Sequence, residues 1–176
     1  MRRLFFALLF AATCPKLAAE IAGVDALFAS DEVFAITLTG PLHAIASDHG
    51  DDPKYRPAEL SFAGADGATR NVAIQLRPRG KSRRNPDACD FPPLRLDLPD
   101  QGIEGTVFAG QDKLKLVTQC HARDTSHRYE QFILKEYVLY RVFNRLTEQS
   151  FRARLVQVTY ADNESKSTPT TSFGFF

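Results

Sequence analysis

The chain has 176 residues, of which 44% are hydrophobic and 24% charged, and its formal net charge is +1. This length and composition are typical of one globular domain that can bury a sizeable core, and no segment is repetitive or of low complexity. The near-zero charge excludes a bulk electrostatic field that would attract nucleic acid or an anionic membrane surface.

The first 19 residues have the order of a secretory signal peptide. A pair of arginines precedes the apolar run 4–12, and small residues lead up to Ala19. The run is about half the roughly 20 residues that a membrane-spanning helix needs, so no membrane span is expected. We predict cleavage after Ala19, a single domain over residues 20–176 and a periplasmic or secreted location. A buried N-terminal helix is the alternative.

The cysteines support this location. Cys14 lies in the predicted leader, and its neighbours Thr13 and Pro15 do not fit a lipidation site, so a lipoprotein is not expected. The mature chain keeps Cys89 and Cys120, and an even pair in an oxidising compartment predicts one disulfide. That bridge would close a loop of about 32 residues, worth roughly 3–4 kcal/mol in the chain-entropy model. Two free or metal-bound thiols are the alternative.

Alternating and β-branched runs predict a mainly antiparallel sheet of five or six strands. A hairpin is expected at Asp66-Gly67, and an exposed loop over residues 43–56. The terminal segment 173–176 is rich in phenylalanine and reads either as a short docked strand or as the start of a strand in a truncated chain; we favour truncation. The predicted strands are 33–39, 58–63, 69–77, 94–98, 113–118 and 152–160.

One long helix is predicted over residues 128–146, a run free of Gly and Pro that Asp124 or Ser126 could cap. Packed on one face of the sheet, it gives an α+β fold. Glu136 lies close to its apolar face, so its carboxylate either reaches the edge of that face or needs a partner, such as Lys113 or Lys115 from the preceding strand. The predicted apolar face comprises Tyr129, Phe132, Ile133, Tyr140 and Phe143, flanked by Leu139 and Leu146.

The strongest charge feature is the acid-free segment 70–84, with Gly80 at a point where a turn could expose backbone N–H groups. Guanidinium groups and such amides bind phosphate, sulfate and carboxylate, so we predict an anionic small molecule or envelope polymer as partner. A solvated loop pairing with Asp87 and Asp90 is the alternative, and the commoner one for a charge run. The predicted anion-binding residues are Arg77, Arg79, Lys81, Arg83 and Arg84.

Other chemistries have weaker signals. No aromatic residue interleaves with the arginines to stack bases, so nucleic acid is not an expected partner. The acidic segment 48–52 lacks the spacing of a calcium loop, and a helix cap with two surface histidines explains His121, Asp124 and His127 equally well. No Gly-x-Ser-x-Gly motif occurs, and no Cys–His pair remains beside a disulfide. We therefore predict no catalytic residue, metal or cofactor.

Residues 72–84 read Val-Ala-Ile-Gln-Leu-Arg-Pro-Arg-Gly-Lys-Ser-Arg-Arg and resemble the strand and Arg-Gly-x-Ser-x-Arg loop of CotH-type spore-coat kinases. The order of elements over about residues 70–176 is similar to the amino-terminal lobe of that atypical kinase fold. The resemblance implies a truncated phosphotransferase lobe as an alternative function. Segment 91–94 has no lysine where the family contacts ATP phosphates, and the catalytic lobe would lie beyond Phe176, so no phosphate transfer is expected from this chain alone.

Overall fold

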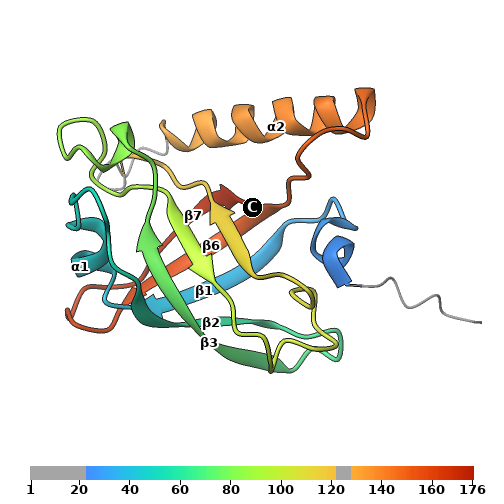
Figure 1. Ribbon diagram of the computed structural model, residues 1–176, viewed down its shortest axis with the longest axis horizontal. Helices are drawn as coiled ribbons and strands as arrows, with labels where there is room; N and C mark the ends of the chain where they lie inside the picture. The colour runs from blue at the N-terminus through green and yellow to red at the C-terminus, as the bar shows by residue number, and fades with distance from the viewer. Residues whose placement is uncertain (1–22, 122–127) are drawn as a thin grey trace, which may run out of the picture.

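The structure is a computed structural model that describes residues 23–121 and 128–176 (Figure 1). The predicted leader, Cys14 and the predicted helix caps Asp124 and Ser126 lie outside the described residues. One sheet holds seven strands in the order β5-β4-β3-β2-β1-β6-β7. The strands are β1 Phe34–Gly40, β2 Arg56–Ala63, β3 Thr69–Pro78, β4 Leu94–Asp97, β5 Lys113–Leu116, β6 Leu155–Asp162 and β7 Thr170–Phe175.

The helical elements are few and unequal in length. The long helix α2 spans Glu130–Leu146, and the short helix α1 spans Leu42–Ala46. Two 3-10 turns, η1 Gly23–Phe28 and η2 Ser82–Arg84, complete the set in the described residues. Helix α1 lies partly inside the predicted loop 43–56, where two buried apolar side chains, Leu42 and Ile45, anchor it to the core. The α+β class is confirmed, and none of the helices in the described ranges is long and apolar enough to span a bilayer.

The sheet differs from the prediction in strand number and in direction. It has seven strands instead of five or six, because the terminal phenylalanine-rich segment forms β7 beside β6. It is also mixed, since β1 pairs with β2 in the antiparallel sense and with β6 in the parallel sense. The parallel pair arises because the chain passes through β2, β3, β4, β5 and α2 before β6 returns beside β1.

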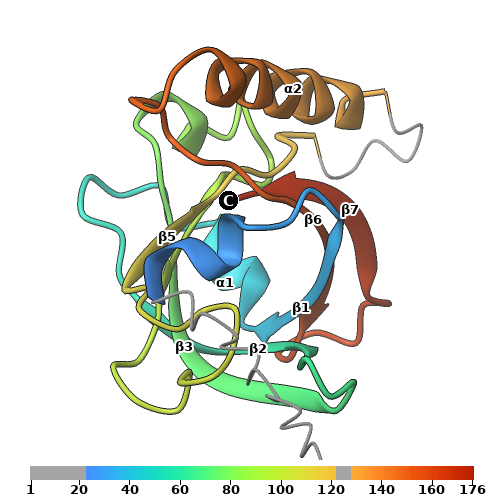
Figure 2. The same cartoon turned by 90° about the vertical axis from the view of Figure 1, so that its right-hand side faces the viewer.

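The sheet curls until its two edges meet (Figure 2). Just after β5, Val117 N–H donates to Phe175 O at 2.9 Å, and Phe175 N–H donates back to Val117 O at 3.3 Å. We call this contact the seam. It encloses a core of alternating strand residues in which Leu38, Leu76 and Leu116 are completely buried.

Gly174 allows the seam to close. A Cβ atom at this position would lie 2.7 Å from Val117 O, closer than real contacts allow. We therefore expect Gly174→Ala to lower the free energy of unfolding by about 1–3 kcal/mol, the range for overpacking a well-packed site. Chemical denaturation of Gly174→Ala and of the control Gly50→Ala, whose new Cβ would have only an ordinary contact at 3.5 Å, checks this. Equal losses in the two variants would contradict the account of the seam.

Helix α2 packs across the seam with only part of the predicted apolar face. Ile133 is buried, and Tyr137 and Tyr140 pack against Phe175, with ring centroids 6.1 and 5.5 Å from its ring. Phe132 and Phe143, both assigned to the packed face, are each 59% exposed. The helix has apolar residues around much of its circumference, so periodicity alone does not tell which stripe the sheet covers.

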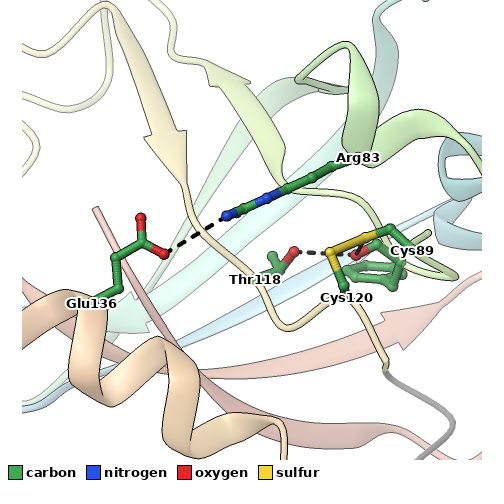
Figure 3. Close-up of a disulfide and its surroundings, with 6 residues drawn as sticks. Arg83, Cys89, Thr118, Cys120 and Glu136 are labelled. Atoms are coloured by element: carbon green, nitrogen blue, oxygen red, sulfur yellow. Dashed lines mark hydrogen bonds and ion pairs between the residues drawn. A yellow bond between two sulfur atoms is a disulfide. The ribbon is translucent and has the colours of Figure 1, made fainter.

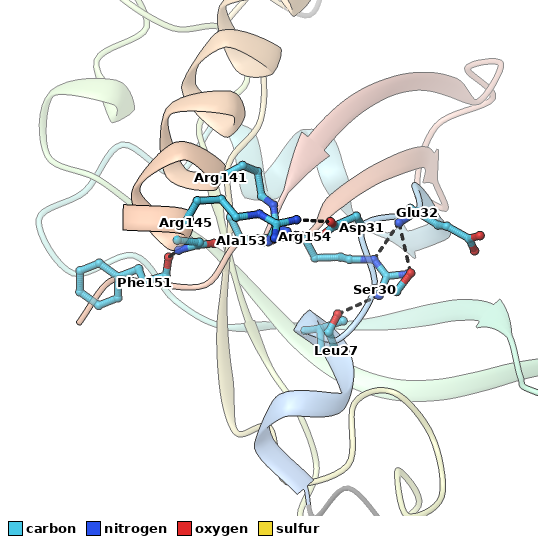
Figure 4. Close-up of polar contacts among 10 residues, drawn as sticks. Leu27, Ser30, Asp31, Glu32, Arg141, Arg145, Phe151, Ala153 and Arg154 are labelled. Carbon is cyan, nitrogen blue, oxygen red and sulfur yellow. Dashed lines mark hydrogen bonds and ion pairs between the residues drawn. The ribbon is translucent and has the colours of Figure 1, made fainter. Parts of the chain in front are cut away.

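A buried arginine connects the start of the described chain to β6 (Figure 4). Arg154 is 7% exposed, and its guanidinium donates to Glu32 O at 2.9 Å and to Leu27 O at 3.0 Å. The same group lies 5.4 Å from the centroid of the Phe34 ring. Beside it, Arg141 and Arg145 of α2 form ion pairs with Asp31. These contacts fix the segment between η1 and β1 against β6 and α2.

Candidate functional site

A cavity of about 520 Å³ opens where the seam, the loop after β3 and helix α2 meet. We call it the seam cavity. Most of its polar lining is cationic, with a single acidic side chain, Glu136, among the described residues. Its charged lining side chains are Arg79, Arg83, Lys113, Lys115, Arg152 and Glu136.

The predicted disulfide fixes the loop beside this cavity (Figure 3). Cys89 and Cys120 are joined, and Cys89 is 2% exposed. The N–H groups of Asp90 and Phe91 donate to Cys120 O, and Thr118 Oγ1 donates to Phe91 O at 3.3 Å. The end of the Arg-rich loop is therefore tied to the segment that follows β5.

Arg79 is the central cation of the cavity. Its backbone N–H donates to Pro93 O at 2.7 Å, which extends the β3–β4 pairing by one residue. Its side chain is half-buried, and within the described part of the chain the guanidinium has no hydrogen-bond or ion-pair partner. Burial is the main cause that lowers the pKa of Arg79, the charges of Arg95 and Arg83 lower it further, and Tyr140 and Glu136 oppose this shift more weakly. An arginine stays protonated in spite of such shifts, so the site holds a partly desolvated, unpaired charge.

Gly80 turns the chain directly after Arg79. Its φ of +86° lies in the left-handed region, which glycine adopts at little cost. Arg84 Nε donates to Gly80 O at 2.6 Å and stabilises this turn. Arg84 therefore shapes the loop, whereas Arg79 and Arg83 line the cavity on either side of the turn.

The partner of Glu136 differs from the prediction. Its carboxylate lies 3.9 Å from the Arg83 guanidinium, not beside Lys113 or Lys115 (Figure 3). Both side chains of this pair are more than a third exposed, so the pair contributes little to stability. Lys113 instead forms ion pairs with Asp112 and Asp97, and Lys115 lies 5.8 Å from the Phe151 ring centroid.

The five residues of the predicted anion site are thus divided by the fold. Arg79 and Arg83 line the cavity, but Arg77, Lys81 and Arg84 do not. Arg77 lies over the Tyr55 ring at 4.6 Å, and Lys81 is exposed beside the turn. Three further cations, Lys113, Lys115 and Arg152, join the cavity from distant parts of the sequence and were not predicted as anion ligands.

The cation excess continues over the outer surface of the sheet. Three cations form a row across neighbouring strands. Arg95 of β4 lies opposite Arg77 of β3 on one side and opposite Lys115 of β5 on the other. Like charges in such cross-strand positions destabilise a sheet. The fold retains this repulsion next to a cavity that already contains the unpaired Arg79, an arrangement that a bound anion would stabilise.

The structure describes the acidic segment 48–52 and, of the predicted histidine cluster, only His121. Asp48 accepts a hydrogen bond from Lys54 N–H at 3.0 Å, and Asp52 forms an ion pair with Lys54. The His121 ring packs on the Tyr129 ring, with the centroids 4.1 Å apart. Asp124 and His127 lie outside the described residues. Among the residues with described positions, no three His, Cys, Asp or Glu side chains are grouped so that they could hold a metal ion.

Comparisons with known proteins find no match for this chain. No protein-family model matches the chain, and no match is found among curated proteins or among solved structures.

Proposed function

We propose that this chain is an exported, non-catalytic protein that binds an anionic group in the seam cavity. The observation that carries the proposal is the Arg79 guanidinium, half-buried and without a hydrogen-bond or ion-pair partner in the described chain, within a lining of five cationic side chains and one acidic side chain. Phosphate, sulfate and carboxylate groups are the natural ligands of such a site, either free or as part of an envelope polymer. A disulfide is typical of proteins in oxidising compartments, which supports export.

The proposal predicts that replacing Arg79 and Arg83 weakens anion binding but does not lower the stability of the ligand-free protein. The double variant Arg79→Ala/Arg83→Ala should bind phosphate and sulfate at least about tenfold more weakly, a loss of roughly 1.4 kcal/mol. Without ligand it should be as stable as the wild type or more stable, because a desolvated and repelled charge is removed. Binding to the wild type should weaken as the NaCl concentration rises, because salt screens the partly exposed cations.

Calorimetric titration and thermal melts with phosphate, sulfate and heparin measure both effects. Arg70→Ala is the matched control, because Arg70 belongs to the same charged segment but forms an ion pair with Asp66 at 2.6 Å and does not line the seam cavity. If none of the three anions shifts the melting of the wild type, or if Arg70→Ala weakens binding as much as the double variant, the proposed function is wrong.

A second candidate is the amino-terminal lobe of a CotH-like phosphotransferase. The outer stripe of α2 supports it, since Leu139, Phe143 and Leu146 are 59–76% exposed on the side away from the sheet and offer an apolar surface to a further lobe. Under this alternative, the DNA downstream of the coding sequence should encode the catalytic lobe. An intact, unrelated gene at that place would remove the candidate.

A further inference from the structure

The seam cavity has an apolar floor as well as a cationic rim. Val117, Ala153, Phe175 and Phe176 line it, and each is at most 8% exposed. The rim residues Lys113, Lys115, Arg83 and Arg152 are exposed. The ring of Phe151 stands at the rim, 78% exposed and beside Lys115. A ligand that enters between the cations therefore meets aromatic and aliphatic carbon beneath them.

The size of the cavity also exceeds what a small inorganic anion can fill. A volume of about 520 Å³ lies within the range of roughly 300–1,000 Å³ typical of sites for organic ligands. A lone phosphate or sulfate between Arg79 and Arg83 would leave most of this volume, and the space above the apolar floor, unfilled. An anion that carries an alkyl chain would fill the same space and remove its own methylenes from water against the apolar floor.

We infer that the ligand of the seam cavity is an amphiphilic anion, with a phosphate, sulfate or carboxylate head held by the rim cations and an alkyl tail on the floor formed by Val117, Phe175 and Phe176. This inference rests on the proposed anion binding and adds the chemistry of the rest of the ligand. A free amphiphile and a membrane lipid share this chemistry. In both, each methylene that the cavity buries strengthens binding by about fourfold at most.

The test compares hexyl phosphate with glycerol phosphate by calorimetric titration of the disulfide-intact protein. The two ligands carry the same anionic group and differ in their apolar part. We expect hexyl phosphate to bind at least about 30-fold more tightly, the gain for two or three fully buried methylenes. Competition with vesicles of phosphatidylglycerol distinguishes the sources: displacement of hexyl phosphate assigns the ligand to a membrane lipid, and lack of displacement assigns it to a soluble amphiphile. Both outcomes sustain the inference.

Two exposed apolar residues provide a matched pair of variants. Phe151 lines the cavity, whereas Leu146 of α2 is almost equally exposed, at 76%, and does not line it. Phe151→Ser should weaken hexyl phosphate binding at least about threefold and leave glycerol phosphate binding unchanged, since only the alkyl tail contacts the ring. Leu146→Ser should change neither, and Arg79→Ala should weaken both.

The failures of the two proposals are distinct. If hexyl phosphate and glycerol phosphate bind equally well, the amphiphile inference is overturned while anion binding stands. If Leu146→Ser instead of Phe151→Ser weakens the binding of hexyl phosphate, the tail lies on α2 and the inference is again overturned. If neither ligand binds, the proposed function fails and the inference fails with it.

Discussion

Replacing both Cys89 and Cys120 by serine is expected to lower the free energy of unfolding by about 3–4 kcal/mol and to weaken phosphate binding. The stability loss follows from loop-closure entropy, because the bridge joins residues 31 apart in the sequence and restricts the unfolded chain. The binding loss follows from the folded state. The bridge holds the Arg79–Phe91 loop against the segment after β5, so without it Arg79 and Arg83 are less well positioned for one anion.

Urea denaturation and phosphate titration of the double variant measure the two effects. Gly50→Ala is a suitable control, since it lies in an exposed loop outside the seam and the bridged segment. A double variant that keeps wild-type phosphate affinity would show that the loop holds its conformation without the bridge. A loss well below 1 kcal/mol in the free energy of unfolding would contradict the prediction that the disulfide stabilises the fold.

The second large effect is expected at Arg154. Arg154→Met keeps much of the apolar length of the side chain but removes both donors, so Leu27 O and Glu32 O lose their partners. Leu27 O is the more deeply buried of the two acceptors, and leaving a buried acceptor unsatisfied costs about 1–3 kcal/mol, so we expect a loss of this size in the free energy of unfolding. The cation–π contact with Phe34 is lost as well.

Arg152→Met is the matched control, because Arg152 is an exposed arginine two residues away and its replacement should change stability by at most about 0.5 kcal/mol. Denaturant unfolding gives the free energies. Hydrogen exchange should become faster in the Arg154 variant over residues 27–34, the segment that the guanidinium holds. Equal stability of the two variants, or unchanged exchange in that segment, would contradict this role.

Local patterns predicted the elements of this fold better than their arrangement. The alternation in β4 and β5 identifies Leu94, Leu96, Leu114 and Leu116 as inward residues, and all four are buried. The hairpin at Asp66-Gly67 is confirmed by β2–β3 pairing and by the positive φ of Gly67. These features depend on neighbours in the sequence, so the sequence alone is informative about them.

The arrangement of these elements depends on contacts between distant residues. The parallel β1–β6 pair joins Phe34 to Val156, and the seam joins Val117 to Phe175, so no local pattern predicts either pair. The apolar face of α2 was predicted only in part for a similar reason, since Ile133 and Tyr140 pack on the seam but Phe132 and Phe143 do not. Phe132 is as hydrophobic as Ile133, and only the position of the seam decides which of them is covered.

The candidate site likewise has residues that a local pattern predicts and residues that only the fold brings together. The sequence singled out Arg79 and Arg83 because they lie in one charged segment, and both line the cavity. It also included Arg77, which lies two residues earlier on β3, about 6–7 Å along the strand, and stacks on Tyr55 instead. Lys115 and Arg152 could be found only after the sheet had curled, since they reach the cavity from β5 and from the segment before β6.

The central claim is that Arg79 and Arg83 together hold an anion in the seam cavity. The most direct test is a phosphate titration followed by the ¹H–¹⁵N signals of the arginine Nε–Hε groups in the disulfide-intact protein. Our account predicts that the Arg79 and Arg83 signals shift together and saturate with one dissociation constant, while those of Arg70 and Arg77 stay in place. A uniform, non-saturating shift of all arginine signals, or no shift at Arg79, would contradict it.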